Sequence, residues 1–361
     1  MTPAHAPAHA PAHAPDHAPA HVPARTPDRK ADRRTAPPAL APVLRTAGRV
    51  AGRAGRAASV LLLVTVSALA LPHLMPGSPA LAALGPTATP EQVAAYEAKL
   101  GLDDNVLAAA WRWLGDALHG DLGHSLSTGA AVTAELADRI PVTLELFVAA
   151  QLVALGLALP VALYSAWRPG GALDRIATAG AFVWLAVPGF VLGLVLIWLA
   201  AVQLRILPAT GWTPFTEDPL DNLRHLVLPA LTLGLTEAAV FTRTLRGQLI
   251  DTLDQTYVAA ARSRGMGTVR LLLRRALRPS SLPLVTLVGI GIGMSLGGSV
   301  LVESLFAVPG VGTLAATAIA GRDFPVVQAV VVVSAVGVVA ATVAVDLLYR
   351  TVDPRIADER R

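Results

Sequence analysis

The feature that most constrains this chain is a set of six long apolar stretches separated by polar segments. A helix needs roughly 17–25 residues to cross the apolar core of a bilayer, and each stretch reaches that length. The stretches are continuously apolar and do not alternate with a period of two, which favours helices over a barrel. They cover residues 58–74, 142–165, 176–204, 226–242, 282–302 and 325–348. The sequence therefore predicts an all-α integral membrane protein with six transmembrane helices.

Composition narrows the class of protein further. Hydrophobic residues make up 53% of the chain and charged residues 15%, whereas about 25% of an ordinary soluble domain is charged. The chain has no cysteine, which excludes disulfides, thiolate catalysis and cysteine metal sites. Neither Lys30 nor Lys99, the only lysines, follows a glycine, so the P-loop pattern GxxxxGK(S/T) is absent. We expect a chain that is not an enzyme and that needs no cofactor or metal.

The distribution of basic residues predicts how the chain is oriented. Arginine and lysine gather in the cytoplasmic loops of membrane proteins. The segment before the first stretch, the segment between the fourth and fifth stretches, and the C-terminal end are all rich in arginine. The long segment between the first and second stretches is instead mainly acidic. We therefore expect both termini in the cytoplasm and residues 76–141 outside.

We expect five regions along the chain. Residues 1–45 repeat His-Ala-Pro-Ala and form a disordered cytoplasmic tail, because proline interrupts helices. A metal-binding tract is the alternative, but a mobile tail does not preorganise ligands. The remaining regions are a basic segment with the first membrane helix (46–75), an extracytoplasmic cap with helices at 90–100 and 106–118 (76–141), a five-helix core containing a cytoplasmic loop at 254–283 (142–349), and a cytoplasmic tail (350–361).

The loop between the fourth and fifth stretches has the pattern of a docking element. Residues 257–283 carry no acidic residue and six arginines: Arg262, Arg264, Arg270, Arg274, Arg275 and Arg278. Tyr257, Val258, Ala260 and Ala261 predict a small apolar face on a first helix, which Gly265 would end in a left-handed conformation. A second helix at 268–277 combines leucines with arginines and suits the headgroup boundary. A helix lying at the membrane surface would explain the positive charge of this loop. It would not explain two helices separated by a glycine, an arrangement that favours docking of a partner protein.

Other residues within the stretches are candidates for a transport pathway. Glu237 lies inside the fourth stretch, and an acid within a membrane is by default a functional candidate. The Glu237 side chain could face the transport pathway, form an ion pair with Arg243 or Arg246, or extend to the membrane surface. Pro188 and Gly189 predict a bend in the third stretch. Glycines spaced four apart allow helices to approach closely; they are Gly189 and Gly193 in the third stretch, and Gly289, Gly293 and Gly297 in the fifth.

Several of these patterns together resemble one family. Ala259, Ala260, Ala261, Gly265 and Leu277 have the spacing of the cytoplasmic coupling loop of ABC-importer permeases. Alanine stands at 259 where glutamate is common, and Arg278 where proline is common, as in the dipeptide/oligopeptide/nickel branch. The resemblance extends over nearly the whole chain from Arg49. Segments 71–80, 120–125, 140–146, 322–325 and 346–355 resemble further motifs of this branch, and so does the extracytoplasmic ExxFxxPGxG element with Glu303, Phe306, Pro309, Gly310 and Gly312.

The resemblance implies a type I ABC-importer permease in a bacterial plasma membrane. Its partners would be a homologous second permease, two ABC ATPase subunits, an extracytoplasmic substrate-binding protein and the bilayer, but no nucleic acid. The ATPase-coupling residues would be Tyr257, Val258, Ala259, Ala260, Ala261, Arg262, Gly265 and Leu277. The pathway candidates are Glu237, Pro188, Gly189, Gly293 and Gly297. The cargo of this branch is a di- or oligopeptide, with nickel chelates and oligosaccharides as alternatives.

Two other classes of membrane protein compete with this hypothesis. An ion-gradient transporter usually shows several intramembrane charges or broken helices in paired halves. Within the predicted spans lie Glu145 and Glu237, with Asp346 near the end of the last one, and no inverted repeat is visible. A membrane hydrolase needs a pattern such as HExxH or GxSxG, and neither occurs around His73, His119, His124 or His225. The residues His119, Asp121 and His124 lie in a predicted turn, so we expect turn chemistry there and no metal site.

Overall fold

The computed structural model describes residues 41–74, 79–85, 87–100 and 105–352. Residues 1–40 of the predicted disordered tail and the Asp353–Arg355 part of the last family motif lie outside these residues, whereas residues 41–45 belong to helix α1, which corrects the predicted end of the tail at residue 45. Contacts divide the chain into two compact units, Met1–Arg53 and Ala54–Arg361. All packing described below lies within the second unit. Every named element in the described ranges is helical, with one isolated antiparallel bridge between His124 and Ala131.

The first membrane helix and the cap region hold four helices. They are α1 (Ala41–Leu74), α2 (Pro79–Leu84), α3 (Pro90–Leu100) and α4 (Val106–Leu118). The predicted bounds of the two cap helices are confirmed. Asn105 caps α4, since its side-chain oxygen accepts a hydrogen bond of 2.9 Å from the backbone N–H of Leu107.

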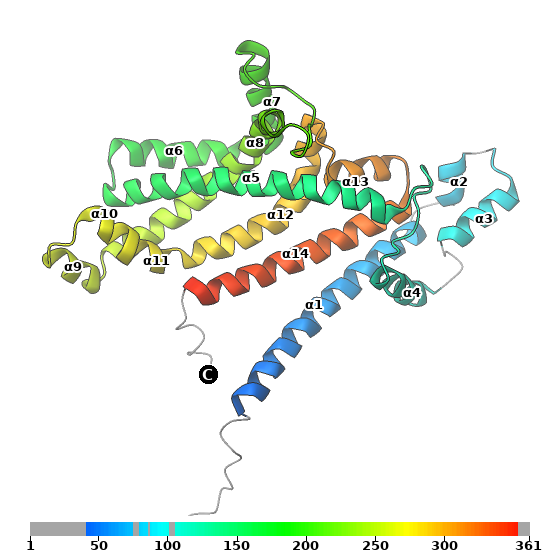
Figure 1. Cartoon of the computed structure of the whole chain (residues 1–361), viewed down its shortest axis with the longest axis horizontal. Helices are drawn as coiled ribbons and strands as arrows, with labels where there is room; N and C mark the ends of the chain where they lie inside the picture. Colours follow the sequence, from blue (N-terminus) through cyan, green and yellow to red (C-terminus); the bar gives the residue numbers. More distant parts are fainter. Residues whose placement is uncertain (1–40, 75–78, 86, 101–104, 353–361) are drawn as a thin grey trace, which may run out of the picture. The chain divides into compact units, whose positions relative to one another are not determined.

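The membrane core consists of straight and bent helices (Figure 1). In order, these are α5 (Val132–Trp167), α6 (Ala172–Ala186), α7 (Gly189–Leu196), the π-helix η1 (Ile197–Gln203), α8 (Pro219–Leu253), α12 (Leu282–Phe306), α13 (Val311–Ala320) and α14 (Phe324–Val352). Four helices in the described ranges are long and apolar enough to cross a membrane, or up to six if each bent pair is one span. The upper figure agrees with the predicted number of six, although the second bent pair, 299–320, only partly overlaps the predicted fifth stretch at 282–302.

The two bends have different local causes. A bend of 105° separates α6 from α7 and η1 at Val187 and Pro188, which confirms the bend predicted there. Proline lacks the amide hydrogen that would continue the helix. The second bend, 89°, separates residues 299–306 of α12 from α13. There Ala307 adopts a left-handed conformation with φ of 54° and ends α12.

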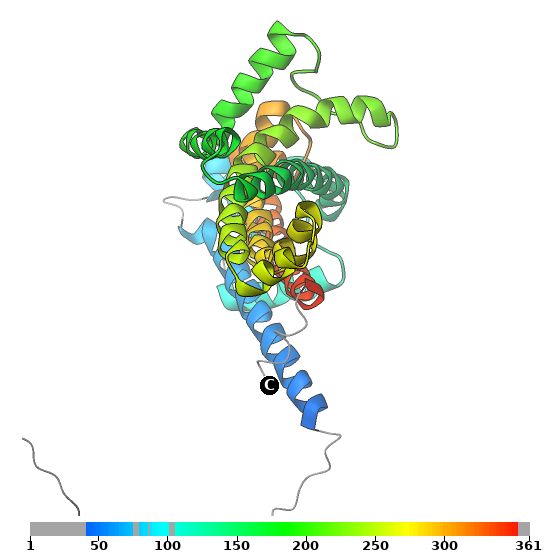
Figure 2. The ribbon, with the colours of Figure 1, turned by 90° about the vertical axis from the view of Figure 1, so that its left-hand side faces the viewer.

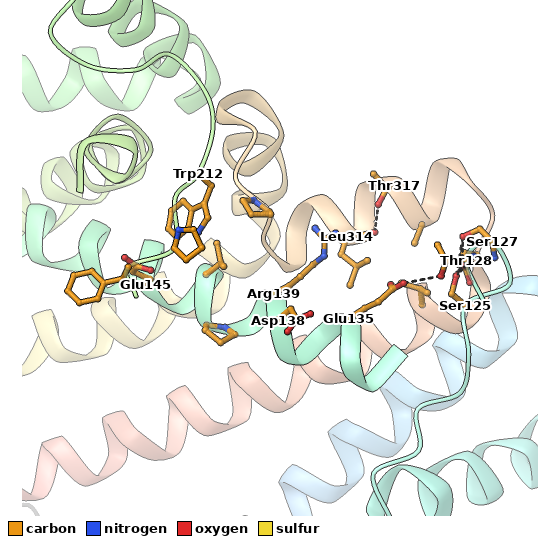
Figure 3. Close-up of a pocket in the computed structure, with 18 of the residues that line it drawn as sticks. Ser125, Ser127, Thr128, Glu135, Asp138, Arg139, Glu145, Trp212, Leu314 and Thr317 are labelled. Atoms are coloured by element: carbon orange, nitrogen blue, oxygen red, sulfur yellow. Dashed lines mark hydrogen bonds between the residues drawn. The ribbon is translucent and has the colours of Figure 1, made fainter. Parts of the chain in front are cut away.

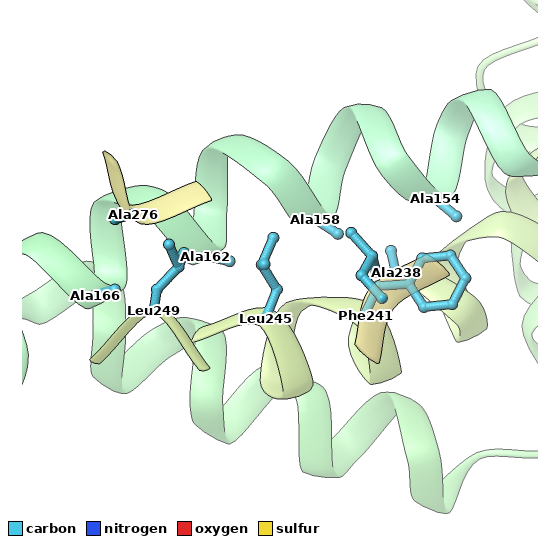
Figure 4. Packing of buried hydrophobic residues seen from close by; sticks show 10 residues of the cluster. Ala154, Ala158, Ala162, Ala166, Ala238, Phe241, Leu245, Leu249 and Ala276 are labelled. Atoms are coloured by element: carbon cyan, nitrogen blue, oxygen red, sulfur yellow. The ribbon is translucent and has the colours of Figure 1, made fainter. Parts of the chain in front are cut away.

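The core is built around the long contact between α5 and α8 (Figure 4). Alanines spaced four apart form one buried face of α5: Ala154, Ala158, Ala162 and Ala166. Phe241, Leu245 and Leu249 of α8 pack into the space that these small side chains leave. The two helices approach closely at Gly234, since a Cβ there would lie 2.7 Å from the backbone oxygen of Ala150.

The remaining helices pack around this pair. Helix α12 contacts α8, α13 and α14, while α6 and α7 lie against α8. Figure 2 looks onto the end of the core that carries α9 and α10, shown in yellow. These short helices belong to the predicted docking loop, so the loop stands at one end of the bundle.

Candidate coupling surface and transport pathway

The predicted docking loop folds as two helical pieces joined at Gly265. The first piece is α9 (Thr256–Ser263), and the second joins α10 (Thr268–Leu271), the π-helix η2 (Leu272–Ala276) and α11 (Leu277–Ser280). Gly265 has a φ of +78°, which confirms the predicted left-handed residue after α9. Its N–H donates to the Arg262 carbonyl at 3.0 Å. No atom lies within 4 Å of the position of a Cβ, so the backbone conformation alone requires glycine here.

The inner face of α9 packs on the chain itself. Val258 and Ala261 are buried against Leu271, with Leu253 and Met266 at the edge of the cluster. This corrects the prediction that Val258 and Ala261 belong to an apolar face presented to a partner. Their packing holds the two helical pieces together as one body. Leu277 is half-buried and packs against the α5–α8 core, so it also contributes structure.

The outer face of α9 and the glycine that follows it form the candidate coupling surface, which we define as Tyr257, Ala259, Arg262 and Gly265. All four residues are exposed, whereas Ala260 is half-buried. The Arg262 guanidinium lies 5.5 Å from the centre of the Trp167 ring at the end of α5, within the range of a cation–π contact. The Tyr257 hydroxyl donates to the Arg275 carbonyl at 3.4 Å. These contacts connect α9 to both α5 and η2.

A partly buried ion pair joins α6 to α8. Asp174, in the first turn of α6, is buried and accepts two hydrogen bonds from the Arg246 guanidinium of α8, one of them 2.8 Å long. Its Oδ2 also accepts from the backbone N–H of Gly170 at 2.8 Å. Arg246 therefore pairs with Asp174, and the alternative pairing of Arg246 with Glu237 is wrong. Asp174 falls outside the predicted third span, which is why sequence analysis missed it.

Glu237 lies in a polar contact between three helices. The Gln151 amide of α5 donates to Glu237 Oε2 at 2.5 Å. A Cβ at Gly291 of α12 would lie 3.5 Å from Glu237 Oε1, so this glycine leaves room for the carboxylate. Gln151 Oε1 is buried without a hydrogen-bond partner among the described atoms. Sequence analysis missed Gln151 and Gly291, although Gln151 is the one amide in a long apolar run.

The other predicted pathway residues whose surroundings the structure describes lie in separate contacts. Gly189 follows Pro188 at the α6–α7 bend, and a Cβ there would lie 3.9 Å from Thr236 Oγ1. Gly293 faces α14 instead, where a Cβ would lie 3.6 Å from Val338. Gly297 lies in α12, at a position whose surroundings the structure does not describe. Gly189 of the bend thus lies beside the α8 segment that carries Glu237.

The ExxFxxPGxG element is a tightly packed turn. The fully buried Glu303 accepts hydrogen bonds of 2.9 Å from the Thr143 hydroxyl of α5 and from the Thr313 N–H in the first turn of α13. A Cβ at Gly310 would lie 2.4 Å from the Glu303 carboxyl carbon, and one at Gly312 would lie 2.8 Å from its oxygen. These glycines allow the carboxylate to reach the N-terminus of α13, where negative charge is stabilised.

The position of this element differs from the prediction. Glu303 and Phe306 belong to the last turns of α12, Pro309 and Gly310 form the turn, and Gly312 lies in α13. Phe306 is buried with Val308 and Leu228. The family resemblance had placed the element in an extracytoplasmic loop after the fifth stretch. Its buried carboxylate instead joins α5, α12 and α13.

A second carboxylate clamps the turn at 120–131 to the start of α14. Asp323 accepts hydrogen bonds from the hydroxyls of Ser125 and Ser127, at 2.5 and 2.8 Å, and from the N–H groups of Leu126 and Ser127. Burial disfavours its charged form, but these hydrogen bonds outweigh burial and lower the pKa of Asp323 below its usual value. Within the same turn, Asp121 Oδ1 accepts from the Gly123 N–H at 2.8 Å, the turn chemistry expected there.

Replacing Asp323 should therefore destabilise the protein in a pH-dependent way. Asp323→Asn removes a charged acceptor, so we expect a loss of about 1–3 kcal/mol in stability at pH 7. Because the folded-state pKa is lowered, this stabilisation is present above the unfolded-state pKa of about 4 and is lost as the pH falls through the folded-state value. Thermal unfolding in detergent would measure the difference between the two proteins, which should shrink below about pH 4. Asp116→Asn, at an exposed position, is the control; an equal effect of both substitutions would contradict the clamp.

A cavity of about 680 Å³ lies beside these two carboxylate sites (Figure 3). Glu145 and Trp212 lie at one end, and Ser125, Ser127 and Thr128 lie at the other. Between them, the wall carries Glu135, Asp138 and Arg139 from the first turns of α5. Helix α5 begins at Val132, earlier than the predicted span, so Glu145 lies well inside the helix. The carboxylates and aromatic rings give the cavity both acidic and apolar surface.

Comparison with known proteins agrees with this architecture. The model of the "Binding-protein-dependent transport system inner membrane component" family matches residues 158–358, and the model of the N-terminal region of such membrane components matches residues 49–147. A probable peptide ABC transporter permease, y4tP of Sinorhizobium fredii, is 34% identical over 82% of this chain and 95% of its own length. The oligopeptide transport system permease AppB of Bacillus subtilis is 35% identical over the same shares.

A solved structure has the same fold at lower sequence similarity. It is the inward-facing MetNI methionine ABC transporter, which matches with a TM-score of 0.50 and 20% identity. The match covers 60% of this chain and 96% of the other chain. At this level of identity, the match supports the fold of the helical core alone.

Proposed function

We propose that this chain, which belongs to the binding-protein-dependent transport system inner membrane component family, is a permease subunit of an ATP-driven importer of di- and oligopeptides. The observation that carries the peptide assignment is the similarity to peptide and oligopeptide permeases over 95% of their length. Nickel chelates and oligosaccharides are the alternative cargoes. The chain is a multi-pass protein of the bacterial plasma membrane, as its apolar helices and its inner membrane family require.

The permease family acts with ATPase and substrate-binding partners, and we assign this chain a place among them. In this proposal it pairs with a homologous second permease, and each permease contacts one of two ABC ATPase subunits in the cytoplasm. The arginine-rich loops support this orientation. The coupling surface of α9 would seat in the ATPase, while an extracytoplasmic binding protein delivers cargo at the other end. ATP hydrolysis takes place in the ATPase subunits.

The packing of α9 suits a lever between ATPase and membrane helices. Its buried Val258 and Ala261 attach it to Leu271, and η2 and α11 continue from there into α12. A movement of the ATPase would therefore be passed to the membrane core as a rigid displacement. ATP and cargo would each act through their different affinities for the inward- and outward-facing states.

The carboxylates of the core suit a cargo that carries a positive charge. A peptide has an N-terminal ammonium group, which the carboxylates in the cavity wall attract. Glu135, Asp138 and Glu145 line that wall. Glu237 lies deeper in the bundle, with Gln151 orienting its carboxylate. In this proposal the ammonium group passes from the cavity to Glu237 during transport.

Uptake into proteoliposomes tests the assignment. The chain would be reconstituted with its partner permease, ATPases and binding protein, and supplied with a radiolabelled tripeptide, a nickel–chelate complex or an oligosaccharide. We expect uptake of the tripeptide that requires ATP and the binding protein. Uptake of the nickel complex or the sugar in its place would reject the peptide assignment, and uptake driven by an ion gradient without ATP would reject the importer.

Glu237→Gln should impair uptake without affecting assembly. The substitution keeps the size of the side chain but removes the charge, and a hydrogen bond to a charged group contributes about 1.5–3 kcal/mol. We therefore expect peptide uptake to fall by roughly ten- to hundredfold, while copurification of the subunits is unchanged. Glu217→Gln changes an exposed acid outside the cavity and is the matched control. Normal uptake by the Glu237 variant would remove this residue from the pathway.

A further inference from the structure

A narrow groove lies at the end of the core that carries the coupling surface. It has a volume of about 300 Å³ and runs between the last turns of α5 and the α10–η2 segment. Leu163, Tyr164 and Trp167 form one wall, and Val269, Leu272 and Leu273 form the other. These side chains are apolar apart from the tyrosine hydroxyl and the indole N–H. The groove therefore suits an apolar chain better than a polar ligand.

The exposure of its walls indicates contact with lipid. Val269 and Leu273 lie one turn apart with exposed fractions of 68% and 50%, and Tyr164 is exposed to 46%. Tyrosine and tryptophan at the end of a membrane helix are typical of the headgroup layer. An α10–η2 segment with exposed apolar side chains beside exposed Arg270 and Arg274 has the pattern of a helix lying in that layer.

The rim of the groove is positively charged. Arg262 stacks on Trp167, so its guanidinium stands beside the α5 wall. All six arginines between residues 257 and 283 are exposed, and that segment has no acidic residue. An arginine guanidinium binds phosphate with two parallel hydrogen bonds. The groove and its rim thus combine an apolar slot with a phosphate-binding group.

We propose that this groove binds an anionic phospholipid of the cytoplasmic leaflet. One acyl chain lies between α5 and α10–η2, and the headgroup phosphate binds Arg262. The assignment of the leaflet rests on the proposed function, which orients the coupling surface toward the cytoplasm. Because Arg262 belongs to α9, the bound lipid would hold the coupling helix against the end of α5.

Native mass spectrometry of the assembled transporter tests this site. The detergent-purified complex would be exposed to phosphatidylglycerol or to phosphatidylcholine with the same acyl chains, and the lipid retained would be measured. We expect preferential retention of phosphatidylglycerol. Arg262→Ala should weaken it about fivefold, which corresponds to roughly 1 kcal/mol for one basic residue at a membrane surface. Val269→Trp, which fills the groove from an exposed position, should reduce retention of both lipids.

Arg264→Ala is the matched control, because Arg264 is exposed on the same segment but does not line the groove or stack on Trp167. Retention should be unchanged in this variant. Equal retention of the two lipids, or no effect of Arg262→Ala and Val269→Trp, would overturn the proposal. Capture of an ATPase subunit by a photo-crosslinker at Leu273 would also overturn it, by identifying a protein as the occupant. Since the readout is lipid retention, these outcomes are independent of whether the cargo is a peptide.

Discussion

Gly265→Val should uncouple ATP hydrolysis from transport while the protein still inserts and assembles. The left-handed conformation at Gly265 costs a residue with a Cβ roughly 1–2 kcal/mol, and a β-branched residue is among the least suited to it. The strain would shift α9 relative to α10 and so displace the coupling surface. We expect ATP-dependent uptake to fall roughly tenfold, the change that about 1.4 kcal/mol produces. Uptake and binding-protein-stimulated ATPase activity would be measured in proteoliposomes.

Gly267 supplies the control for this experiment. It lies two residues further along, also without atoms within 4 Å of a Cβ position, but its φ of −63° suits any residue. Gly267→Val should therefore leave uptake nearly unchanged. Equal effects at the two positions would show that the bulk of the side chain matters and the backbone conformation does not. Intact stimulation of the ATPase in Gly265→Val would contradict the docking assignment.

Gly312→Ala should destabilise the turn between α12 and α13 more than any exposed glycine substitution. The added methyl group would lie 2.8 Å from both the Glu303 carboxylate and the Val300 Cα, and the backbone atom has little freedom to move. Overpacking of this kind costs about 1–3 kcal/mol. The same buried carboxylate joins α5, α12 and α13, so the expected result is a lower melting temperature and less folded protein in detergent extracts.

Gly115→Ala is the matched control, because Gly115 is also helical but has no atom within 4 Å of a Cβ position. Alanine is favoured over glycine in a helix by about 1 kcal/mol, so this variant should be as stable as the parent or more so. Melting curves, with size-exclusion chromatography as the readout of folded protein, would compare both variants with the parent. If the Gly312→Ala protein has the same melting temperature as the parent, the turn accommodates a Cβ, and the close packing of Gly312 against Glu303 is not required.

Much of the helical framework could be predicted because a helix that crosses a bilayer must be long and continuously apolar. A continuous apolar run predicted α14, and Pro188 predicted the bend before α7 because it lacks an amide hydrogen. The start of α5 at Val132 could not be predicted from hydropathy. Its first turns carry Glu135, Asp138 and Arg139, which a purely apolar criterion assigns to the loop.

The site was less predictable, because burial and long-range contact decide what each residue does. Val258 and Ala261 are apolar, and a face that binds a partner has the same sequence pattern as a face that packs on Leu271. The carboxylate of Asp323 shows why contacts between distant parts of the chain escape sequence analysis. Asp323 binds Ser125, which lies almost two hundred residues earlier in the chain. Sequence analysis identified both motifs separately but had no means to pair them.

Site-specific crosslinking from the coupling surface tests the central claim most directly. The chain has no cysteine, so Ala259→Cys introduces a single thiol at an exposed position of α9. A photoreactive thiol reagent would be attached in native membranes, and the products identified by mass spectrometry. Ala95→Cys, exposed on α3, is the control. The account predicts an adduct between position 259 and an ABC ATPase, with none from position 95. A folded, assembled chain that gives no ATPase adduct from position 259 would contradict it.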